Sequence, residues 1–417
     1  MNGFALRVDG TVYGRVELDE RIRELRMADV CRSPEGKRFA IVFRHPMDVL
    51  AAAIYFRNAG ASILLLGGDT PYARAIEIAS AAGCNALLFG SPSQAVRLVG
   101  GSDPRMPFAP ALCQYSSGTT GAPKLVVRPW TDIDGEIESY NLRLAPSGGE
   151  SPLVLVPVTH SYGLIAGVLA GLARGASPHV VRMNNPKSAL RRLREEPDAI
   201  VYAVPFLYQL LDALSKGEAR YRKAVSSGAP LTGALLARMK QSAGEVWQQY
   251  GCSECGCISL GRDPAAPEDV GQPLSHLSAE AEEGADREIV VTAGARAIRT
   301  GDSGYVSPDG RLHVLGRLDD LINVSGQKVM PSEIETVIGS MPGVREVVVY
   351  GSTHPVWGEA VSAIAVAEGG VSKEGVREFC AQRLPAYKVP YAVRFVDEIP
   401  RPPSGKISRR YIRQREE

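Results

Sequence analysis

The stretch RFAIVFRHPMDVLAAAIYFRNAGASILLLG, residues 38–67, indicates the fold class of the chain. Short apolar runs at its two ends enclose a longer run of helix-forming residues. A strand, a helix and a second strand in this order are typical of a parallel sheet covered by helices. The same alternation continues to residue 90 and returns between residues 151 and 257. The sequence therefore predicts an α/β fold whose large N-terminal part contains parallel, helix-covered sheets.

A different pattern begins at residues 258–317, where short β-like segments alternate with many Gly and Pro residues. This pattern predicts a small β-rich subdomain, antiparallel or barrel-like. Residues 318–417 follow a compact α+β pattern, which predicts a small C-terminal domain beside a large domain at residues 1–317. Ser332 and Glu335 have the spacing of a capping box at the start of the first helix of the small domain.

Composition and charge exclude several classes of protein. The chain has 417 residues, of which 45% are hydrophobic and 22% charged, as in ordinary globular proteins. Its 47 Lys and Arg nearly balance its 46 Asp and Glu, so no broad basic surface for nucleic acid is expected. No apolar stretch reaches the roughly 18 residues of a membrane-spanning helix, and the N-terminus lacks the basic and apolar regions of a signal peptide. We therefore expect a cytoplasmic protein without a nucleic-acid partner or a membrane-inserted segment.

The seven cysteines lack the regular spacing of a disulfide framework, which also favours a reducing compartment. Three of them, Cys252, Cys255 and Cys257, lie in the sequence CSECGC. Their spacing allows zinc or an iron–sulfur cluster, but no fourth ligand follows nearby and the other cysteines stand alone. The alternative is that these cysteines flank a motif with another task.

The sequence YSSGTTGAPK, residues 115–124, follows an apolar run and is rich in Gly, Ser and Thr. Backbone N–H groups beside glycines, hydroxyl groups and a lysine are the parts of a phosphate-binding loop. Composition alone is equally consistent with a mobile surface loop. The sequence is not a Walker motif, because Lys124 is followed by Leu125 where that motif requires Ser or Thr.

The order of residues in this loop resembles the signature loop of the adenylate-forming enzymes. That family includes acyl- and aryl-CoA synthetases, the adenylation domains of peptide synthetases, and luciferase. Three further stretches resemble motifs of the family, in the family's order. These are QYGCSE at residues 249–254, the stretch from RTGD to SEIE at residues 299–335, and PRPPSGKISRRYIR at residues 400–413. The resemblance is nearest to aryl- and acyl-CoA ligases, and it implies ATP, Mg²⁺ and a mobile C-terminal domain.

The resemblance also implies a set of nucleotide-binding residues. Tyr250 would stack near adenine, the Ser253 hydroxyl would meet the α-phosphate, and Glu254 would help to hold Mg²⁺, which prefers oxygen ligands. Asp302 would accept both ribose hydroxyls, because a carboxylate has the two oxygens that a vicinal diol needs. The implied nucleotide-binding residues, whose loop members hold the β- and γ-phosphates, are Ser116, Ser117, Gly118, Thr119, Thr120, Gly121, Lys124, Ser227, Gly228, Ala229, Tyr250, Gly251, Asp302 and Arg317.

Catalysis in such an enzyme depends on a lysine that bridges the substrate carboxylate and the α-phosphate, and Lys406 has that position by resemblance. Asp319 falls at the hinge about which the small domain rotates, and Gly326 lines the tunnel for the thiol. Charge neutralisation and alignment, more than acid–base chemistry, are expected to accelerate the meeting of two anions. The implied catalytic residues are Lys406, Glu254, Ser253 and His160.

The residues that would bind the acid are indicated by weaker sequence resemblance. PVTHSYG, residues 157–163, resembles the segment beside the acyl pocket, which makes His160 a candidate; a lone core histidine is the alternative. Residues 153–172 contain no acidic residue, so a free α-amino acid, whose ammonium group needs a carboxylate, is not expected. Aryl and short aliphatic acids both remain open. The candidate pocket residues are His160, Ala203, Val204, Phe206, Gly228 and Cys252.

Three functions fit these motifs. We expect a ligase that activates an apolar aryl or acyl acid as acyl-AMP and passes it to coenzyme A. The alternatives are a ligase that loads the phosphopantetheine of a carrier protein, and a degenerate nucleotide-binding protein without turnover. The chain is shorter than is typical before residue 115 and between Glu254 and Asp302, which can alter the pocket wall, oligomer contacts or the thiol-docking surface.

Overall fold

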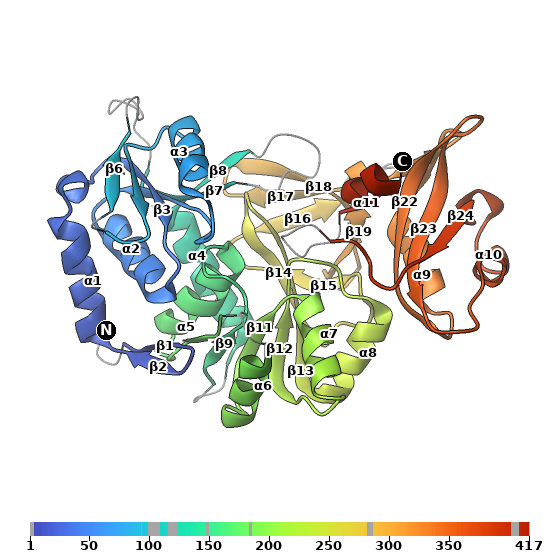
Figure 1. Cartoon of the computed structure of the whole chain (residues 1–417), viewed down its shortest axis with the longest axis horizontal. Helices are drawn as coiled ribbons and strands as arrows, with labels where there is room; N and C mark the ends of the chain where they lie inside the picture. Colours follow the sequence, from blue (N-terminus) through green and yellow to red (C-terminus); the bar gives the residue numbers. More distant parts are fainter. Residues whose placement is uncertain are drawn as a thin grey trace.

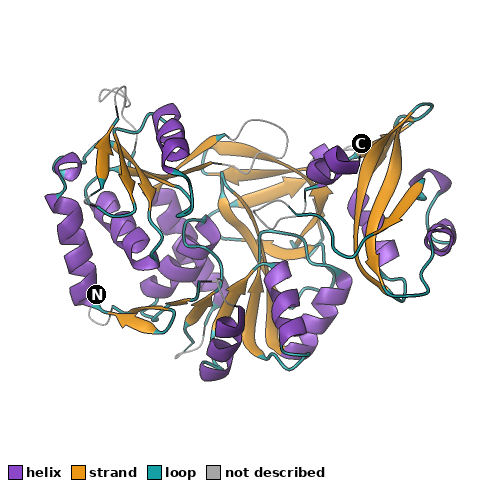
Figure 2. Cartoon of the chain, viewed as in Figure 1, coloured by secondary structure: helices purple, strands orange, loops and turns teal. Residues whose placement is uncertain are grey.

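The computed structural model describes residues 4–92, 94–98, 109–115, 124–146, 150–182, 186–281, 287–401 and 408–416. Within these residues, the strands form three sheets, of six, thirteen and five strands. Helices flank the first two sheets, and the third sheet lies with the C-terminal helix at one end of the molecule (Figure 1). Helices lie beside the sheets in the N-terminal part and at the C-terminal end, as the α/β prediction requires (Figure 2).

The first sheet contains the stretch that indicated the fold class. Strand β3 pairs in parallel with both β4 and β5, and α2 connects β3 to β4, which confirms the predicted strand–helix–strand unit. Helix α2 begins with a proline at its first position, where the missing N–H has no intrahelical partner to lose. The elements are β3 (Arg38–Val42), α2 (Pro46–Asn58), β4 (Ser62–Leu65), α3 (Tyr72–Ala81), β5 (Ala86–Phe89), β6 (Ala95–Arg97), β7 (Ala111–Tyr115) and β8 (Leu125–Pro129).

The second sheet has a parallel half that begins with the N-terminal strand of the chain. Strand β1 pairs in parallel with β10, so the chain enters this sheet before it builds the first one. The elements of this half are β1 (Leu6–Val8), β2 (Thr11–Tyr13), α1 (Arg15–Met27), α4 (Trp130–Leu144), β9 (Pro152–Val154), η2 (Tyr162–Leu169), α5 (Ala170–Ala173), β10 (His179–Val180), α6 (Pro186–Glu195), β11 (Ile200–Ala203), α7 (Pro205–Leu214), β12 (Tyr221–Ser226), α8 (Gly233–Ser242) and β13 (Ala243–Cys252).

The antiparallel half of the second sheet corresponds to the predicted β-rich stretch. Its first strand pairs with β13, so these strands continue the second sheet. The sheet curls strongly, because side chains of β13 and β18 meet although three strands separate the two in sheet order. The strands are β14 (Gly256–Arg262), β15 (Asp269–Pro273), β16 (Ser278–Ala281), β17 (Glu288–Ala293), β18 (Arg296–Val306) and β19 (Leu312–Arg317).

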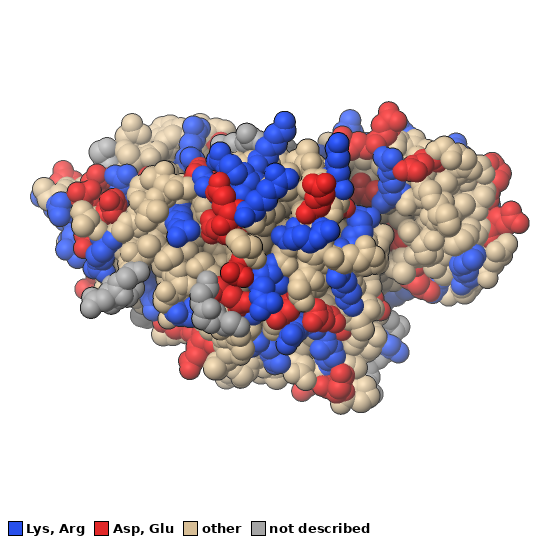
Figure 3. All heavy atoms as spheres, turned by 90° about the horizontal axis from the view of Figure 1, so that it is seen from below, with Lys and Arg blue, Asp and Glu red and all other residues tan. Residues whose placement is uncertain are grey.

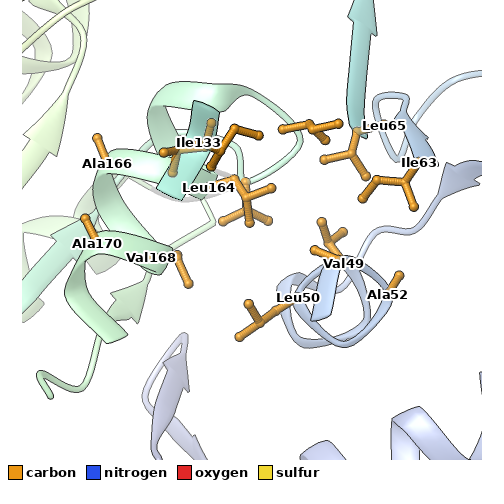
Figure 4. Packing of buried hydrophobic residues seen from close by; sticks show 14 of the residues in the cluster. Val49, Leu50, Ala52, Ile63, Leu65, Ile133, Leu164, Ala166, Val168 and Ala170 are labelled. Carbon is orange, nitrogen blue, oxygen red and sulfur yellow. The ribbon is translucent and has the colours of Figure 1, made fainter. Parts of the chain in front are cut away.

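The largest core cluster joins the first two sheets. Leu50 of α2, Ile63 of β4, Ile133 of α4 and Leu164 of η2 converge there and are almost completely buried (Figure 4). Burial of each such side chain contributes about 1.5–3 kcal/mol. Helix η2 lies very close to β9, because a Cβ atom at Gly167 would be only 2.8 Å from a methyl group of Val154. Glycine at this position therefore allows η2 to pack closely against β9.

The C-terminal region, residues 318–417, begins with a short helix and has its own sheet, ordered β21-β20-β23-β22 with β24 beside β23. Its core is separate from those of the other sheets. The helices α9 and α10 and the strands β22 to β24 fit the α+β pattern that the sequence predicted for this region. The elements are η3 (Leu318–Asp320), β20 (Ile322–Val324), β21 (Gln327–Val329), α9 (Pro331–Gly339), β22 (Val344–His354), β23 (Gly358–Ala367), α10 (Lys373–Ala381), η4 (Ala386–Lys388), β24 (Ala392–Phe395) and α11 (Arg409–Glu416).

The predicted capping box at Ser332 and Glu335 is wrong. Helix α9 begins at Pro331 after Met330, so Ser332 already lies inside the helix. The Ser332 hydroxyl donates to the carbonyl of Leu315 in the N-terminal part of the chain. Glu335 accepts hydrogen bonds from Arg409. Both side chains therefore make tertiary contacts instead of local ones.

The surface shows no large field of one charge on the face drawn in Figure 3, where basic and acidic side chains alternate. This agrees with a formal net charge of +1. Among the described residues, no helix is long and apolar enough to cross a membrane.

Candidate functional site

Three parallel strands of the second sheet, β9, β11 and β12, end at one level, and the fourth, β13, passes this level and continues to Cys252. Tyr202 of β11 pairs with Val154 of β9 on one side and with Val225 of β12 on the other, and Val225 pairs with Trp247 of β13. In open α/β sheets, ligands bind beyond the carboxyl ends of such strands. The predicted residues that follow this level are His160, Ala203, Val204, Phe206, Ser227, Gly228, Ala229, Tyr250, Gly251 and Cys252.

The segments after β11 and β12 lie against each other. Gly228 has a φ of +85°, and a Cβ atom at this residue would be 3.4 Å from a methyl group of Val204. Tyr162 is bound to the end of β12, because its hydroxyl donates a hydrogen bond to the carbonyl of Val225 across 2.7 Å. Phe206 lies in the first turn of α7 and remains 38% exposed. The structure thus brings together Val204 and Gly228, two residues predicted for the acid pocket.

A hydrogen bond links the end of β7 to the segment that contains His160. The side-chain amide of Gln114 donates to the carbonyl of Thr159 across 3.0 Å. The signature loop begins directly after β7, so this contact places the start of that loop near the exposed His160. Lys124 is exposed just before β8, whereas Ser116, Ser117, Gly118, Thr119, Thr120 and Gly121 lie outside the described residues.

Ser253 and Glu254 lie in the tight turn between β13 and β14. Ser253 is half-buried and Glu254 is exposed. Gly256 follows with a φ of +73°, a backbone conformation that favours glycine. A Cβ atom at Gly256 would lie within 2.6 Å of the guanidinium group of Arg128. The backbone of this turn therefore packs directly on a buried charged group.

That buried group is an ion pair that the sequence did not reveal. Arg128 of β8 and Glu136 of α4 are joined at 2.5 Å, and their side chains are 5% and 3% exposed. Oε1 of Glu136 also accepts a hydrogen bond from the backbone N–H of Cys257 at 2.8 Å. The pair thus fixes the strand that follows Ser253 and Glu254. Eight residues separate Arg128 from Glu136, and no local pattern showed that both are buried.

The three clustered cysteines do not point to one centre. The thiol of Cys252 donates to the sulfur of Cys255; this bond raises the pKa of Cys252 and lowers that of Cys255. Cys257 instead donates to the carbonyl of Ser259 across 3.5 Å, and burial raises its pKa. Within the part of the chain that the structure describes, no three His, Cys, Asp or Glu side chains are grouped to hold a metal.

Asp302 is the centre of a polar cluster at the edge of the site. The hydroxyl of Tyr250 donates to its Oδ2 across 2.6 Å, and Arg317 donates to its Oδ1 across 3.1 Å. Arg317 also pairs with Asp319 at 3.4 Å. The structure therefore joins three residues predicted for nucleotide binding, Tyr250, Asp302 and Arg317, to the predicted hinge residue.

Burial dominates the electrostatics of this cluster. It raises the pKa of Asp302, although the hydrogen bond from Tyr250 and the charge of Arg317 oppose the effect. Burial and the nearby Asp302 also raise the pKa of Tyr250 well above its usual value. The neutral phenol therefore remains a donor, and each carboxylate oxygen retains a lone pair for a further hydroxyl donor. Such a carboxylate fits a vicinal diol such as ribose.

The start of the C-terminal region is tied to the last helix. Arg409 donates to Asp320 at 2.7 Å and to Glu335 at 2.8 Å, so α11 is anchored beside Asp319. Gly326, at the turn between β20 and β21, has a φ of +86° and is exposed, with no atom within 4 Å of a Cβ built on it. Lys406 lies outside the described residues.

Two family matches cover most of the chain. The AMP-binding enzyme family matches residues 54–293, and the AMP-binding enzyme C-terminal domain matches residues 333–406. The chain resembles the solved ATP-bound MatB of Rhodopseudomonas palustris with a TM-score of 0.84 at 21% identity, over 99% of this chain and 96% of that one. This likeness establishes the fold of an adenylate-forming enzyme.

Relatives of known activity support the same family assignment. The chain is 40% identical to a 3,4-dihydroxybenzoate–[aryl-carrier protein] ligase of Bacillus anthracis, over 98% of both chains. It is 30% identical to a 2-succinylbenzoate–CoA ligase of Bacillus licheniformis, over 72% of this chain and 69% of that one. The resemblance seen in the motifs is thereby confirmed. The chain belongs to the AMP-binding enzyme family and is an acid–thiol ligase that uses ATP and Mg²⁺ to join a small carboxylic acid to the thiol of coenzyme A or a carrier protein.

Proposed function

We propose that the chain activates a hydroxylated benzoic acid as its adenylate and transfers the aryl group to the phosphopantetheine thiol of a carrier protein. The observation that carries this proposal is the match over 98% of both chains with an aryl-carrier protein ligase. The compact segments that set this chain apart from longer ligases are thus shared with that relative. The CoA ligase, by contrast, is matched over 69% of its length. Coenzyme A ends in the same pantetheine arm and is the second candidate acceptor.

In the first half-reaction, a carboxylate oxygen of the acid attacks the α-phosphorus of ATP, and the bond to pyrophosphate breaks. Lys406 would neutralise the meeting anions, with Lys124 and the signature loop on the β- and γ-phosphates. Glu254 would hold Mg²⁺, which supplies positive charge to the phosphates when it is bound. Ser253 would donate to the α-phosphate. Electrostatic stabilisation of this kind is usually the largest catalytic contribution.

The nucleoside would lie between the strand ends and the polar cluster. Asp302 would accept the ribose hydroxyls while Tyr250 and Arg317 hold its carboxylate in place. Ser227, Gly228, Ala229 and Gly251 would border the adenine with their backbones. The acid would lie beside His160, Val204 and Phe206, where Gly228 leaves room for a flat ring.

The second half-reaction would use a different arrangement of the two domains, residues 1–317 and 318–417. The thiol attacks the acyl carbon, and AMP leaves with the electrons of the anhydride bond. Asp319 would serve as the hinge, since its neighbours Arg317 and Asp320 hold one domain each. Gly326 would line the thiol tunnel, where its exposed backbone leaves space for the arm. We place the enzyme in the cytoplasm, because its seven cysteines form no disulfide.

The proposal is tested by two linked measurements. Pyrophosphate release is first screened over hydroxylated benzoates, unsubstituted benzoate and short aliphatic acids. The preferred acid is then supplied with ATP, Mg²⁺ and either coenzyme A or a phosphopantetheinylated aryl-carrier protein. We expect release with a hydroxylated benzoate and a mass increase of the carrier by one aryl group. Preference for an aliphatic acid would overturn the substrate class. Thioester formation with coenzyme A alone would overturn the carrier protein as acceptor. A protein that binds ATP but releases no pyrophosphate with any acid would support the degenerate alternative.

A further inference from the structure

Arg401 makes a contact between the C-terminal region and the wall of the acid site. Its guanidinium group lies over the ring of Phe206, 5.0 Å from the ring centroid. The same guanidinium group forms an ion pair with Glu346 of β22. The Arg401 side chain is only 16% exposed, so it is packed between the two partners. One cation is thus shared between the sheet of the C-terminal region and helix α7.

The position of Phe206 relates this contact to the predicted acid pocket. Phe206 lies in the first turn of α7, two residues after Val204, which contacts Gly228 across the end of the sheet. It is a large apolar side chain that remains 38% exposed. A cation over an aromatic ring is attracted by the partial negative charge of the ring face, most strongly where water is excluded. Arg401 therefore covers one face of the ring of Phe206, a residue predicted for the acid pocket.

Two other contacts between the described residues of the two regions lie beside the hinge segment. Ser332 donates to the carbonyl of Leu315, and Gly316 lies against Met330. Contacts beside a pivot change little when a domain rotates, whereas contacts that lie away from the pivot break. Arg401, by contrast, contacts helix α7 of the N-terminal part, and it precedes Lys406 by five residues. The described residues that follow β24, 396–401, run toward the N-terminal region (Figure 1).

We propose that Arg401 is a positioning residue for the adenylation half-reaction. By binding Phe206 and Glu346 at once, it would hold the C-terminal region against helix α7, in the arrangement that the first half-reaction would use. This role rests on the proposed function. Thiol transfer would use the rotated arrangement, in which Arg401 leaves Phe206. Arg401 should therefore affect the first half-reaction and leave the second unchanged.

The experiment measures the two half-reactions separately. Arg401→Ala should lower the kcat of acid-dependent pyrophosphate release about tenfold, the loss expected for a partly desolvated cation–π contact. Transfer from purified aryl-adenylate to pantetheine should keep its wild-type rate. Arg401→Lys retains the cation and should recover part of the loss. The matched control is Arg383→Ala, because Arg383 lies 3.6 Å over Phe379 and donates hydrogen bonds to Phe379 and Gln382, all within the C-terminal region.

The possible outcomes separate this role from a structural one. Slowing of both half-reactions by the same factor, or of neither, would overturn the role of Arg401. An equal effect of Arg383→Ala on adenylation would overturn it as well, since that contact does not join the two regions. A wild-type enzyme that transfers supplied adenylate but forms none would overturn the proposed function, and with it the positioning role. Loss confined to adenylation in Arg401→Ala supports both.

Discussion

Tyr250 and Asp302 are joined by a 2.6 Å hydrogen bond, although they come from strands that three others separate in sheet order. In a flat sheet, strands in such positions would be about 19 Å apart, at about 4.8 Å per strand. The curled antiparallel half therefore closes back on the end of the parallel half. This closure places a buried carboxylate beside the strand ends where the nucleotide would bind.

Replacement of Asp302 should weaken the use of ATP. Asp302→Ala removes the acceptor of the ribose hydroxyls, and hydrogen bonds to charged groups contribute about 1.5–3 kcal/mol, so KM for ATP should rise roughly 10- to 100-fold. Initial rates of pyrophosphate release at varied ATP measure the change. Asp309→Ala is the control, because Asp309 lies in an exposed turn and bonds to Ser307. An unchanged KM in Asp302→Ala would remove Asp302 from the nucleotide site.

The same carboxylate predicts a pH dependence. Burial raises the pKa of Asp302, so the group loses its charge at a higher pH than an ordinary aspartate as the solution is acidified. As the pH falls, KM for ATP should therefore begin to rise at a higher pH than it would with an aspartate of ordinary pKa, and Asp302→Asn should remove this dependence.

The raised pKa of Asp302 has the opposite effect on the stability of the fold, which it favours at low pH. A raised pKa contributes stability below the pKa of the unfolded chain, and this contribution is lost as the pH rises through the folded value. A wild-type profile identical to that of Asp302→Asn would contradict the assignment.

The buried ion pair beneath the turn of Ser253 and Glu254 should support stability as a unit. Glu136→Ala leaves Arg128 buried without its carboxylate, and such losses cost about 3–5 kcal/mol. Urea unfolding should show this loss. Glu138→Ala on the exposed face of the same helix should have almost no effect. A Glu136→Ala protein as stable as Glu138→Ala would show that the pair does not fix the hairpin.

Substitutions at Gly256 and Gly310 distinguish the cost of steric crowding from the cost of backbone strain. Gly256→Ala requires a positive φ and places a methyl group against Arg128 and Glu136, whereas Gly310→Ala has a similar φ of +79° and no atom closer than 3.8 Å. Strain alone costs about 1–3 kcal/mol, so Gly256→Ala should lose clearly more stability than Gly310→Ala. It should also lower the kcat of pyrophosphate release, because the turn of Glu254 must shift. Equal thermal unfolding midpoints for the two variants would contradict the close packing.

The sequence predicted the parts of the site that depend on local order. The motifs around Tyr250 and Asp302 were found by resemblance, and the structure brings the two residues into contact. Arg128 and Glu136 were missed, because only tertiary packing shows that a charged pair is buried. Ser332 and Glu335 had the spacing of a local cap but contact Leu315 and Arg409, so the local pattern misled where distant partners compete. The helices α1 and α4 were not predicted, and the curl of the second sheet follows from strand pairing that no single stretch contains.

The most direct test of the central claim compares the wild-type protein with Lys406→Ala in acid-dependent pyrophosphate release. With ATP, Mg²⁺ and a hydroxylated benzoate, the wild-type protein should release pyrophosphate only when the acid is present. The variant should lose almost all of this activity, while ATP binding followed by calorimetry remains. Release from no acid would contradict the ligase mechanism for this chain, and full activity in Lys406→Ala would contradict the role of that lysine.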